Sequence, residues 1–383
     1  MRRGSKYNTC FLAVLLLICL LNAMTLSILT THRVQVVPAL AQGSASAADS
    51  LAFANPSDGQ SPAATLPADT DSTQQEGSSE QDYIRYVEFN PTYDALKKAM
   101  DLDIQSQNEE VVIDWIDLLA YLGATYGGDF SRYQESDMDA FVQQLQSGRS
   151  VQELTDDMQY FAYYREAYGA VLQEFLGTYR VQQPSEENPD QLEWVECYGL
   201  KNYSPIAKGF AFEHYDDFGQ RRTYGYSRAH LGHDMMAATG TPVIAVESGV
   251  VEAMGWNQYG GWRIGIRSFD GQRYYYYAHL RQNRPYHCDL YEGKVVKAGD
   301  VIGYVGRTGY STTENVNNIE VSHLHFGLQL IFDESQKESD NEIWVDCYAL
   351  VQLLQHHKSS VIRIAETKEF YREFDSTEPL LTG

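Results

Sequence analysis

The first strongly apolar segment of the chain lies close to its N-terminus. Residues 10–29 carry no charge, and only Asn22, Thr25 and Ser27 interrupt the run. Twenty such residues in a helix cross a hydrocarbon core about 30 Å thick. Residues 1–33 contain four basic side chains and no acidic one, a bias that favours a cytoplasmic N-terminus. We therefore predict a transmembrane signal anchor in residues 1–33 that places the rest of the chain outside the cell membrane.

A cleaved signal peptide is the alternative interpretation of this segment. The tripeptide ending at Ala41 has the small-x-small form of a cleavage site, although it lies ten residues beyond the apolar run. Cleavage near Ala41 would give a secreted protein instead of a single-pass membrane protein. Both interpretations export the remainder of the chain.

The pattern after residue 33 predicts a spacer, a helical domain and a linker. Residues 34–81 are rich in Ser, Ala, Asp and Gln and read as a disordered spacer. Within residues 82–182, apolar side chains recur at steps of three and four from Val112 to Leu122 and again from Met158 to Phe175. This period predicts a small all-α domain, with Gly127-Gly128 ending one of its helices. A polar linker is expected over residues 183–204.

From residue 205 the period changes to that of short strands. Apolar runs at 241–246, 250–254, 262–267, 273–279 and 301–305 alternate with glycine-containing turns. Asp270-Gly271 between two of these runs is a strong hairpin signal. Residues 205–332 therefore predict an antiparallel β domain, followed by a C-terminal helix near 343–356 and a tail within 333–383. The fold class is multidomain, with a transmembrane segment, a helical domain and an antiparallel β-sheet domain.

Charge and cysteine content narrow the function. The formal net charge is −23, which excludes a general nucleic-acid binder because phosphate contacts need clustered Lys and Arg. Outside the apolar segment the chain has Cys197, Cys288 and Cys347. Three cysteines allow at most one internal disulfide, and the sequence does not decide whether it forms.

Histidines gather in three short motifs inside the predicted β domain: His230-Leu-Gly-His-Asp234, Tyr277-Ala-His279-Leu and Ser322-His323-Leu-His325. Residues two apart on a strand share a face, so His323 and His325 point together while Leu324 points to the core. By the same rule we expect His279 to share a face with Tyr275 and Tyr277. Two histidines and one aspartate make a three-ligand set with an open position, as in catalytic zinc sites. Two further histidines are then left for acid–base work.

In this order and context the motifs resemble the lysostaphin/LytM-type zinc metallopeptidases. The turns Gly299-Asp300-Val-Ile-Gly303 and Gly306-x-Thr308-Gly309 are also similar to those of the family, and the resemblance covers about residues 205–332. It implies a LytM/lysostaphin-like peptidase domain without an extended helical core. The implied activity is endopeptidase cleavage of peptidoglycan peptide stems or cross-bridges.

The resemblance also implies roles for individual residues. His230, Asp234 and His325 would bind Zn²⁺, and His279 and His323 would be the catalytic pair. His233 stands where the family usually has an aliphatic residue, and it is either a misleading second ligand or a neighbour that tunes the site. Tyr224, Tyr226, Tyr259 and Tyr275 are candidates for the walls of a substrate groove.

A second class of function stays open at this point. Some members of the family serve as scaffolds or as activators of other hydrolases, often after losing ligands. The anchor, the spacer and a helical domain that could bind a protein partner suit a membrane-tethered scaffold, for example in sporulation. The complete set of five motif residues favours the enzyme.

Overall fold

The computed structural model describes residues 87–378 except Gly225, Glu338 and Asp340, with the side chains of residues 224–227 also left out. The predicted anchor and spacer, including the apolar run 10–29 and the cleavage site near Ala41, lie outside the described residues. Among the described helices, none is long and apolar enough to span a membrane.

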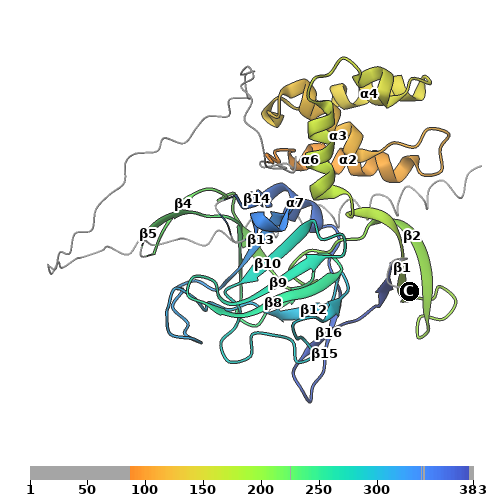
Figure 1. Cartoon of the computed structure of the whole chain (residues 1–383). Coiled ribbons are helices and arrows are strands. Elements are labelled where there is room, and N and C mark those ends of the chain that lie inside the picture. The colour runs from red at the N-terminus through yellow and green to blue at the C-terminus, as the bar shows by residue number, and fades with distance from the viewer. Residues whose placement is uncertain (1–86, 225, 338, 340, 379–383) are drawn as a thin grey trace, which may run out of the picture. The chain divides into compact units, whose positions relative to one another are not determined.

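Five α-helices and a short 3₁₀ helix form the helical region (Figure 1). They are α2 (Tyr93–Ser106), α3 (Trp115–Tyr126), η1 (Phe130–Arg132), α4 (Glu135–Gln146), α5 (Val151–Thr155) and α6 (Phe161–Leu172). Asp114 caps α3 by accepting hydrogen bonds from the backbone N–H groups of Ile116 and Asp117. Gly127 ends the helix in the left-handed conformation at φ 64°, which a residue without a Cβ adopts readily. The expected helical region and this helix end are thereby confirmed.

The segment expected to be a linker is instead part of a β-hairpin. Strand β1 (Leu176–Pro184) pairs antiparallel with β2 (Leu192–Leu200). The C-terminal strand β17 (Ser376–Thr377) joins the other edge of β1. Over much of both strands the side chains alternate only between half-buried and exposed positions. The exposed positions of β2 include Leu192 and Trp194, so apolar and polar residues do not alternate as they do in a strand with one buried face. The linker prediction for residues 183–204 is wrong for this reason.

An antiparallel sheet with the order β11-β8-β9-β10-β13-β6-β3 forms the centre of the β domain, and β14 adds to β13. The strands of this sheet are β3 (Phe212–His214), β6 (His233–Ala237), β8 (Gly249–Asn257), β9 (Gly261–Ser268), β10 (Arg273–Ala278), β11 (Val295–Val296), β13 (His323–Leu330) and β14 (Ile343–Val345). Gly271, at φ 77°, closes the hairpin between β9 and β10. The antiparallel β domain and the Asp270-Gly271 turn are as predicted.

Smaller elements surround this sheet. They are the pairs β4 (Arg221–Tyr224) with β5 (Tyr226–Ala229), β7 (Pro242–Ile244) with β12 (Val301–Tyr304) and β15 (Val361–Arg363) with β16 (Phe370–Arg372), the 3₁₀ helix η2 (Glu334–Gln336) and helix α7 (Tyr348–Leu354). The predicted C-terminal helix is shorter than 343–356, because residues 343–345 form β14 on the sheet. The three described cysteines, Cys197, Cys288 and Cys347, are free thiols.

One hydrophobic core includes residues from the helical region and from the sheet. At their junction Arg273 of β10 is fully buried. Its guanidinium donates to both carboxylate oxygens of Glu247, at 2.8 and 3.0 Å, and to the backbone carbonyl of Ala170 in α6 at 2.9 Å. Because a buried charge is costly unless it is paired, this network fixes the end of α6 against the sheet.

Candidate metal centre and groove

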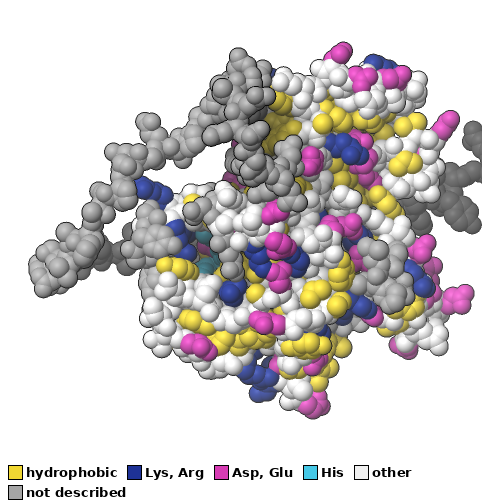
Figure 2. Space-filling view, viewed as in Figure 1, with side chains coloured by type: hydrophobic (Ala, Val, Ile, Leu, Met, Phe, Trp, Pro, Cys, Tyr) yellow, Lys and Arg dark blue, Asp and Glu magenta, His cyan; other side chains and the backbone are white. Residues whose placement is uncertain are grey.

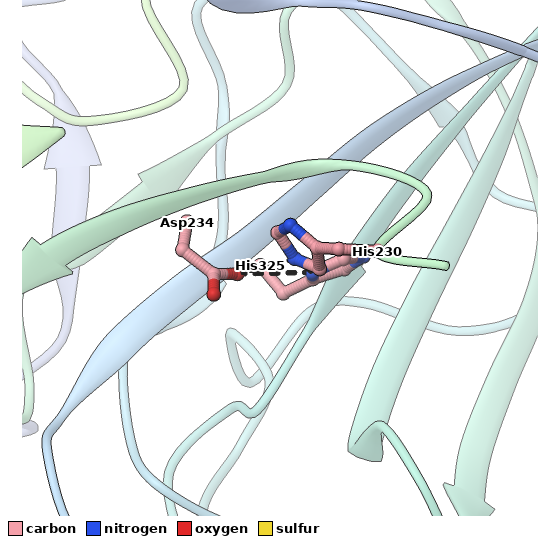
Figure 3. A group of neighbouring side chains, drawn as sticks. All are labelled: His230, Asp234 and His325. Atoms are coloured by element: carbon pink, nitrogen blue, oxygen red, sulfur yellow. Dashed lines mark hydrogen bonds and ion pairs between the residues drawn. The ribbon is translucent and has the colours of Figure 1, made fainter. Parts of the chain in front are cut away.

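Three chain segments bring His230, Asp234 and His325 together (Figure 3). His230 directly follows hairpin β4–β5, Asp234 lies on β6, and His325 lies on the neighbouring strand β13. The register of β6 and β13 places Asp234 opposite His325. Leu324 and Phe326 point to the other side and are buried in the core, which holds His325 in the orientation that the strand alternation predicts.

The three side chains present one donor atom each to a common point. His230 Nε2 lies 3.0 Å from Asp234 Oδ1 and 3.0 Å from His325 Nδ1, and His325 Nδ1 lies 3.0 Å from Asp234 Oδ1. A tetrahedral zinc with bonds of about 2.0 to 2.1 Å has ligand atoms about 3.3 Å apart. Two imidazole nitrogens and a carboxylate oxygen in such a triangle fit a zinc ion that keeps one position open.

The backbone between two of these residues passes close to the third. A Cβ added to Gly232 would lie 2.5 Å from His325 Nε2 and 2.9 Å from the carbonyl oxygen of Phe326. Only glycine fits there without a shift of the ring or of the strand. The short His230–Asp234 segment therefore depends on Gly232 to approach His325.

Carboxylates dominate the electrostatics of this centre. Burial alone would lower the pKa of His230, but hydrogen bonds and charge from Asp217 and Asp234 outweigh it and raise the pKa to about 9. Burial would raise the pKa of Asp234, and hydrogen bonds from His230 and His325 hold it well below its usual range. Without a metal, His230 is thus protonated at neutral pH, and a bound cation takes the place of that proton.

A further carboxylate and a guanidinium support the centre from outside. Asp217 accepts from His230 Nδ1 through its backbone carbonyl at 3.2 Å, and its carboxylate lies 3.3 Å from the same nitrogen. Arg222 of β4 forms an ion pair with Asp217 and donates to Asp234 Oδ2 at 3.3 Å. A partner on the far nitrogen of a metal-binding imidazole fixes its tautomer and orientation, and here it leaves His230 Nε2 for the metal.

His279 and His323 flank the centre, with ring centroids 4.8 Å apart. His279 donates from Nδ1 to the carbonyl of Thr308 at 2.9 Å, and His323 donates from Nδ1 to the carbonyl of Val321 at 2.8 Å. Because Nδ1 of each ring faces a carbonyl oxygen, Nε2 is the nitrogen that is left to face the metal centre. Burial, followed by the nearby charges of His323 and His325, lowers the pKa of His279 well below its usual value.

His279 reaches the site in a way that strand alternation does not predict. Strand β10 ends at Ala278, and His279 has a left-handed φ of 60°. Tyr275 and Tyr277 point into the core and are fully buried, whereas Tyr276 packs edge-on against His325 with centroids 5.9 Å apart. The expectation that His279 shares a face with Tyr275 and Tyr277 is wrong, because the backbone turn after Ala278 reverses the side-chain direction.

The metal centre opens into a cavity of about 480 Å³. Figure 2 shows histidine side chains in a hollow with Lys and Arg side chains beside it. The cavity is lined by both metal-site histidines, Asp234, His279 and side chains from β9, β10, β13 and β14. Of the proposed wall tyrosines, Tyr259 lines it and Tyr275 does not. The side chains of Tyr224 and Tyr226 lie outside the described residues.

Comparison with known proteins agrees with this geometry. Residues 228–339 match Peptidase family M23. This chain contains an M23 peptidase domain.

Several relatives of the M23 domain are named as endopeptidases. The L-Ala–D-Glu endopeptidase of Bacillus subtilis is 38% identical over 32% of this chain and 36% of its own length. Lysostaphin of Staphylococcus staphylolyticus is 41% identical over 25% of this chain and 18% of its own length. The solved catalytic domain of lysostaphin from Staphylococcus simulans is 30% identical over 37% of this chain and 92% of that domain, with a TM-score of 0.29. The chain thus spans about a third or less of the two curated relatives.

The M23 domain assembles all five residues singled out in the sequence. It does not use His233, which points away from the metal centre and hydrogen-bonds His214. Sequence reasoning missed Asp217 and Arg222, because nothing in the 13-residue separation of Asp217 from His230 marks them as partners. It also missed the groove side chains of Tyr276 and Trp344. Trp344 packs over Gly327, where an added Cβ would lie 2.7 Å from the indole ring.

Proposed function

We propose that this protein is a zinc-dependent endopeptidase that hydrolyses peptide stems or cross-bridges of bacterial peptidoglycan. The observation that carries the proposal is the convergence of three donor atoms 3.0 Å apart beside two histidines that each have Nε2 left to face the metal centre. A structural zinc site is usually closed by four protein ligands, so a three-ligand site with two adjacent bases supports catalysis.

His230, Asp234 and His325 would hold the metal. Zinc bound there supplies a Lewis acid for the scissile carbonyl and lowers the pKa of a bound water. The Nε2 of His323 lies 3.7 Å from Asp234 Oδ1, so it borders the centre and can accept a proton from that water. His279 Nε2 can accept a proton in the same way, and either imidazolium could then stabilise the oxyanion or protonate the leaving amine.

Metal content and hydrolysis measured together test this proposal. In the full-length protein purified in detergent, we expect one zinc per chain and release of new amino termini from peptidoglycan. His323→Ala and His279→Ala should keep the zinc and lose about 10²- to 10⁴-fold in kcat. His356→Ala is the matched control, because this histidine contacts Tyr93 and lies outside the cavity. If the unmodified protein binds zinc but does not hydrolyse peptidoglycan, the proposed enzymatic function is wrong. The alternative function, a membrane-tethered scaffold or activator, then stands.

We also propose that residues 10–29 hold the protein in the cell membrane, with the M23 domain on the outer side. The apolar run and the basic residues before it support this location. The alternative is secretion after cleavage near Ala41. The mass of the mature N-terminus of the protein, measured in isolated membranes, distinguishes the retained anchor from cleavage. A protein partner for residues 82–182 belongs to the same proposal, because none of the described residues in this range, 87–182, lines the cavity.

A further inference from the structure

Four cationic side chains line the metal-site cavity, although the chain as a whole carries a formal charge of −23. Two of the four are already neutralised. Arg222 pairs with Asp217, and Lys337 pairs with Glu252. The remaining two, Arg228 and Arg263, form no ion pair with a described residue.

Arg228 is held in place without a carboxylate. It lies on β5 (Tyr226–Ala229), and its guanidinium lies over the rings of Tyr259 and Tyr310, 4.7 and 5.4 Å from their centroids. Its Nε is buried and has no hydrogen-bond acceptor among the described residues. Stacking on aromatic faces orients a guanidinium and leaves its N–H groups in the ring plane for another ligand.

Arg263 is the second arginine of the cavity with an unpartnered Nε. It lies on β9 and lines the cavity, and its buried Nε likewise lacks an acceptor among the described residues. A buried donor without a partner is destabilising, because it has lost its hydrogen bonds to water. Two such guanidinium donors in one cavity indicate an anionic ligand that no described residue supplies.

Both charges lie near the metal centre. Burial raises the pKa of Tyr276, and a hydrogen bond with Asn257, followed by the charges of Arg263 and Arg228, counteracts that rise. Tyr276 itself packs against the metal ligand His325. The two guanidinium groups therefore act on a ring that touches the metal site, within reach of a peptide bound across it.

We propose that Arg228 and Arg263 form a carboxylate-binding subsite, so that the substrate is a peptide with a free carboxylate close to the scissile bond. Guanidinium groups bind carboxylates through paired, charge-assisted hydrogen bonds. A neutral glycine bridge offers no such group. This inference rests on the proposed function and adds a substrate class to it.

A pair of matched peptides tests the subsite. The first peptide is a stem peptide containing D-Glu with a free α-carboxylate, the second is its α-carboxamide, and pentaglycine is the neutral reference. With the zinc-loaded full-length protein we expect kcat/KM for the carboxylate to exceed that for the carboxamide by about 10-fold or more, as for one charged hydrogen-bonded contact. The preference should shrink as salt is raised.

Substitutions assign the preference to the two arginines. Arg228→Gln and Arg263→Gln should each reduce the carboxylate-to-carboxamide ratio about 5-fold or more, and the double variant should bring it near 1. Arg221→Gln is the matched control, since this exposed arginine lies on the same hairpin and outside the cavity. It should leave the ratio unchanged. An equal rate for both peptides, a preference for pentaglycine, or a preference that survives in the double variant would overturn the subsite.

Binding separates this inference from the proposed activity. In the zinc-loaded His323→Ala variant, calorimetric titration measures the affinity for the two uncleaved peptides. If no peptide is hydrolysed by the unmodified protein, the proposed function fails, and the subsite still stands when the carboxylate binds more tightly than the carboxamide. If hydrolysis occurs and the two affinities are equal in this variant, the subsite fails and the proposed function stands.

Discussion

Two groups of histidines lie on opposite sides of strand β6. Asp234 faces His230 and His325, whereas its neighbour His233 faces the opposite way, because adjacent side chains on a strand alternate. His233 Nε2 lies 2.8 Å from Nδ1 of His214, and the other nitrogen of His214 lies 3.0 Å from the amide of Gln355 in the turn after α7. Both groups are largely buried and both join rings at hydrogen-bond distance.

Their difference lies in the carboxylates. Asp217 and Asp234 raise the pKa of His230 to about 9, whereas burial, aided by the charge of His214, lowers the pKa of His233 to about 4. In the His214–His233 pair one ring donates a hydrogen bond to the other. The lone pair of the accepting nitrogen is therefore not available to a metal. In the metal-free centre the proton on His230 Nε2 lies between Asp234 Oδ1 and His325 Nδ1, and a bound cation replaces it and is shared by all three atoms. In this protein the candidate metal site thus lies on the face of β6 where a carboxylate completes the set of donors.

The largest effect is expected from exchanging one residue on each face of β6. Asp234→Asn should abolish zinc binding and lower hydrolysis by about 10³-fold or more, because it removes an anionic ligand. His233→Gln should keep one zinc and near-normal hydrolysis. Metal content and amino-group release from peptidoglycan measure both. A zinc-free His233→Gln protein, folded by circular dichroism, would show that the two faces are not independent.

Part of this arrangement could be predicted because it depends on short-range periodicity. The alternation His323-Leu324-His325 fixes which side chains face the groove, and the five-residue motif at 230–234 supplies two ligands from one turn and strand. The hairpin at Asp270-Gly271 is likewise a local feature. Each of these follows from two to five consecutive residues.

Other features depend on contacts that the sequence does not reveal. His279 enters the groove only because the backbone turns to φ 60° after Ala278. The run of tyrosines before it does not predict this turn. Asp217 precedes hairpin β4–β5 and Arg222 lies on β4, and their contacts with His230 and Asp234 form only in the folded chain. Hairpin β1–β2 was hidden because neither strand buries a clean face.

The opposite pKa shifts predict opposite pH dependences for the two groups in metal-free protein. The pKa of His230 is about 9 when folded and about 6.5 when unfolded. The contribution of His230 to the free energy of unfolding is therefore complete below pH 6.5. It disappears as the pH rises through 9, a loss of about 3 kcal/mol. The folded pKa of His233 is about 4, so its contribution is present above pH 6.5 and is lost as the pH falls to 4.

Urea unfolding in the presence of a chelator checks both windows. Stability of the unmodified protein should fall between pH 6.5 and 9, and His230→Gln should flatten that decline. Zinc should also flatten it, since the metal replaces the proton on His230. The same decline in His230→Gln would assign the effect to another group.

A smaller effect is expected when only the support of the metal centre is altered. Asp217→Asn retains the shape of the side chain but removes the charge beside His230 Nδ1 and Arg222. We expect zinc affinity to fall by about 10- to 100-fold, the usual cost of losing a partner of a metal-binding histidine. Asp216→Asn, on the exposed neighbouring residue, is the control. Competition with a zinc chelator measures the two constants, and equal values for both variants would remove Asp217 from the site.

The smallest effect on function should come from the other face of β6. His214→Ala leaves a nitrogen of His233 without its partner, which costs about 1 to 3 kcal/mol of stability for a buried polar group. Zinc stoichiometry and kcat/KM should remain unchanged, because the His214–His233 pair shares no hydrogen bond with the metal centre. Measuring stability together with zinc stoichiometry and kcat/KM in this one variant separates an effect on packing from an effect on the metal centre. If His214→Ala lowers zinc affinity as much as Asp217→Asn, then β6 transmits strain between its faces, and the division of roles between His233 and Asp234 does not hold.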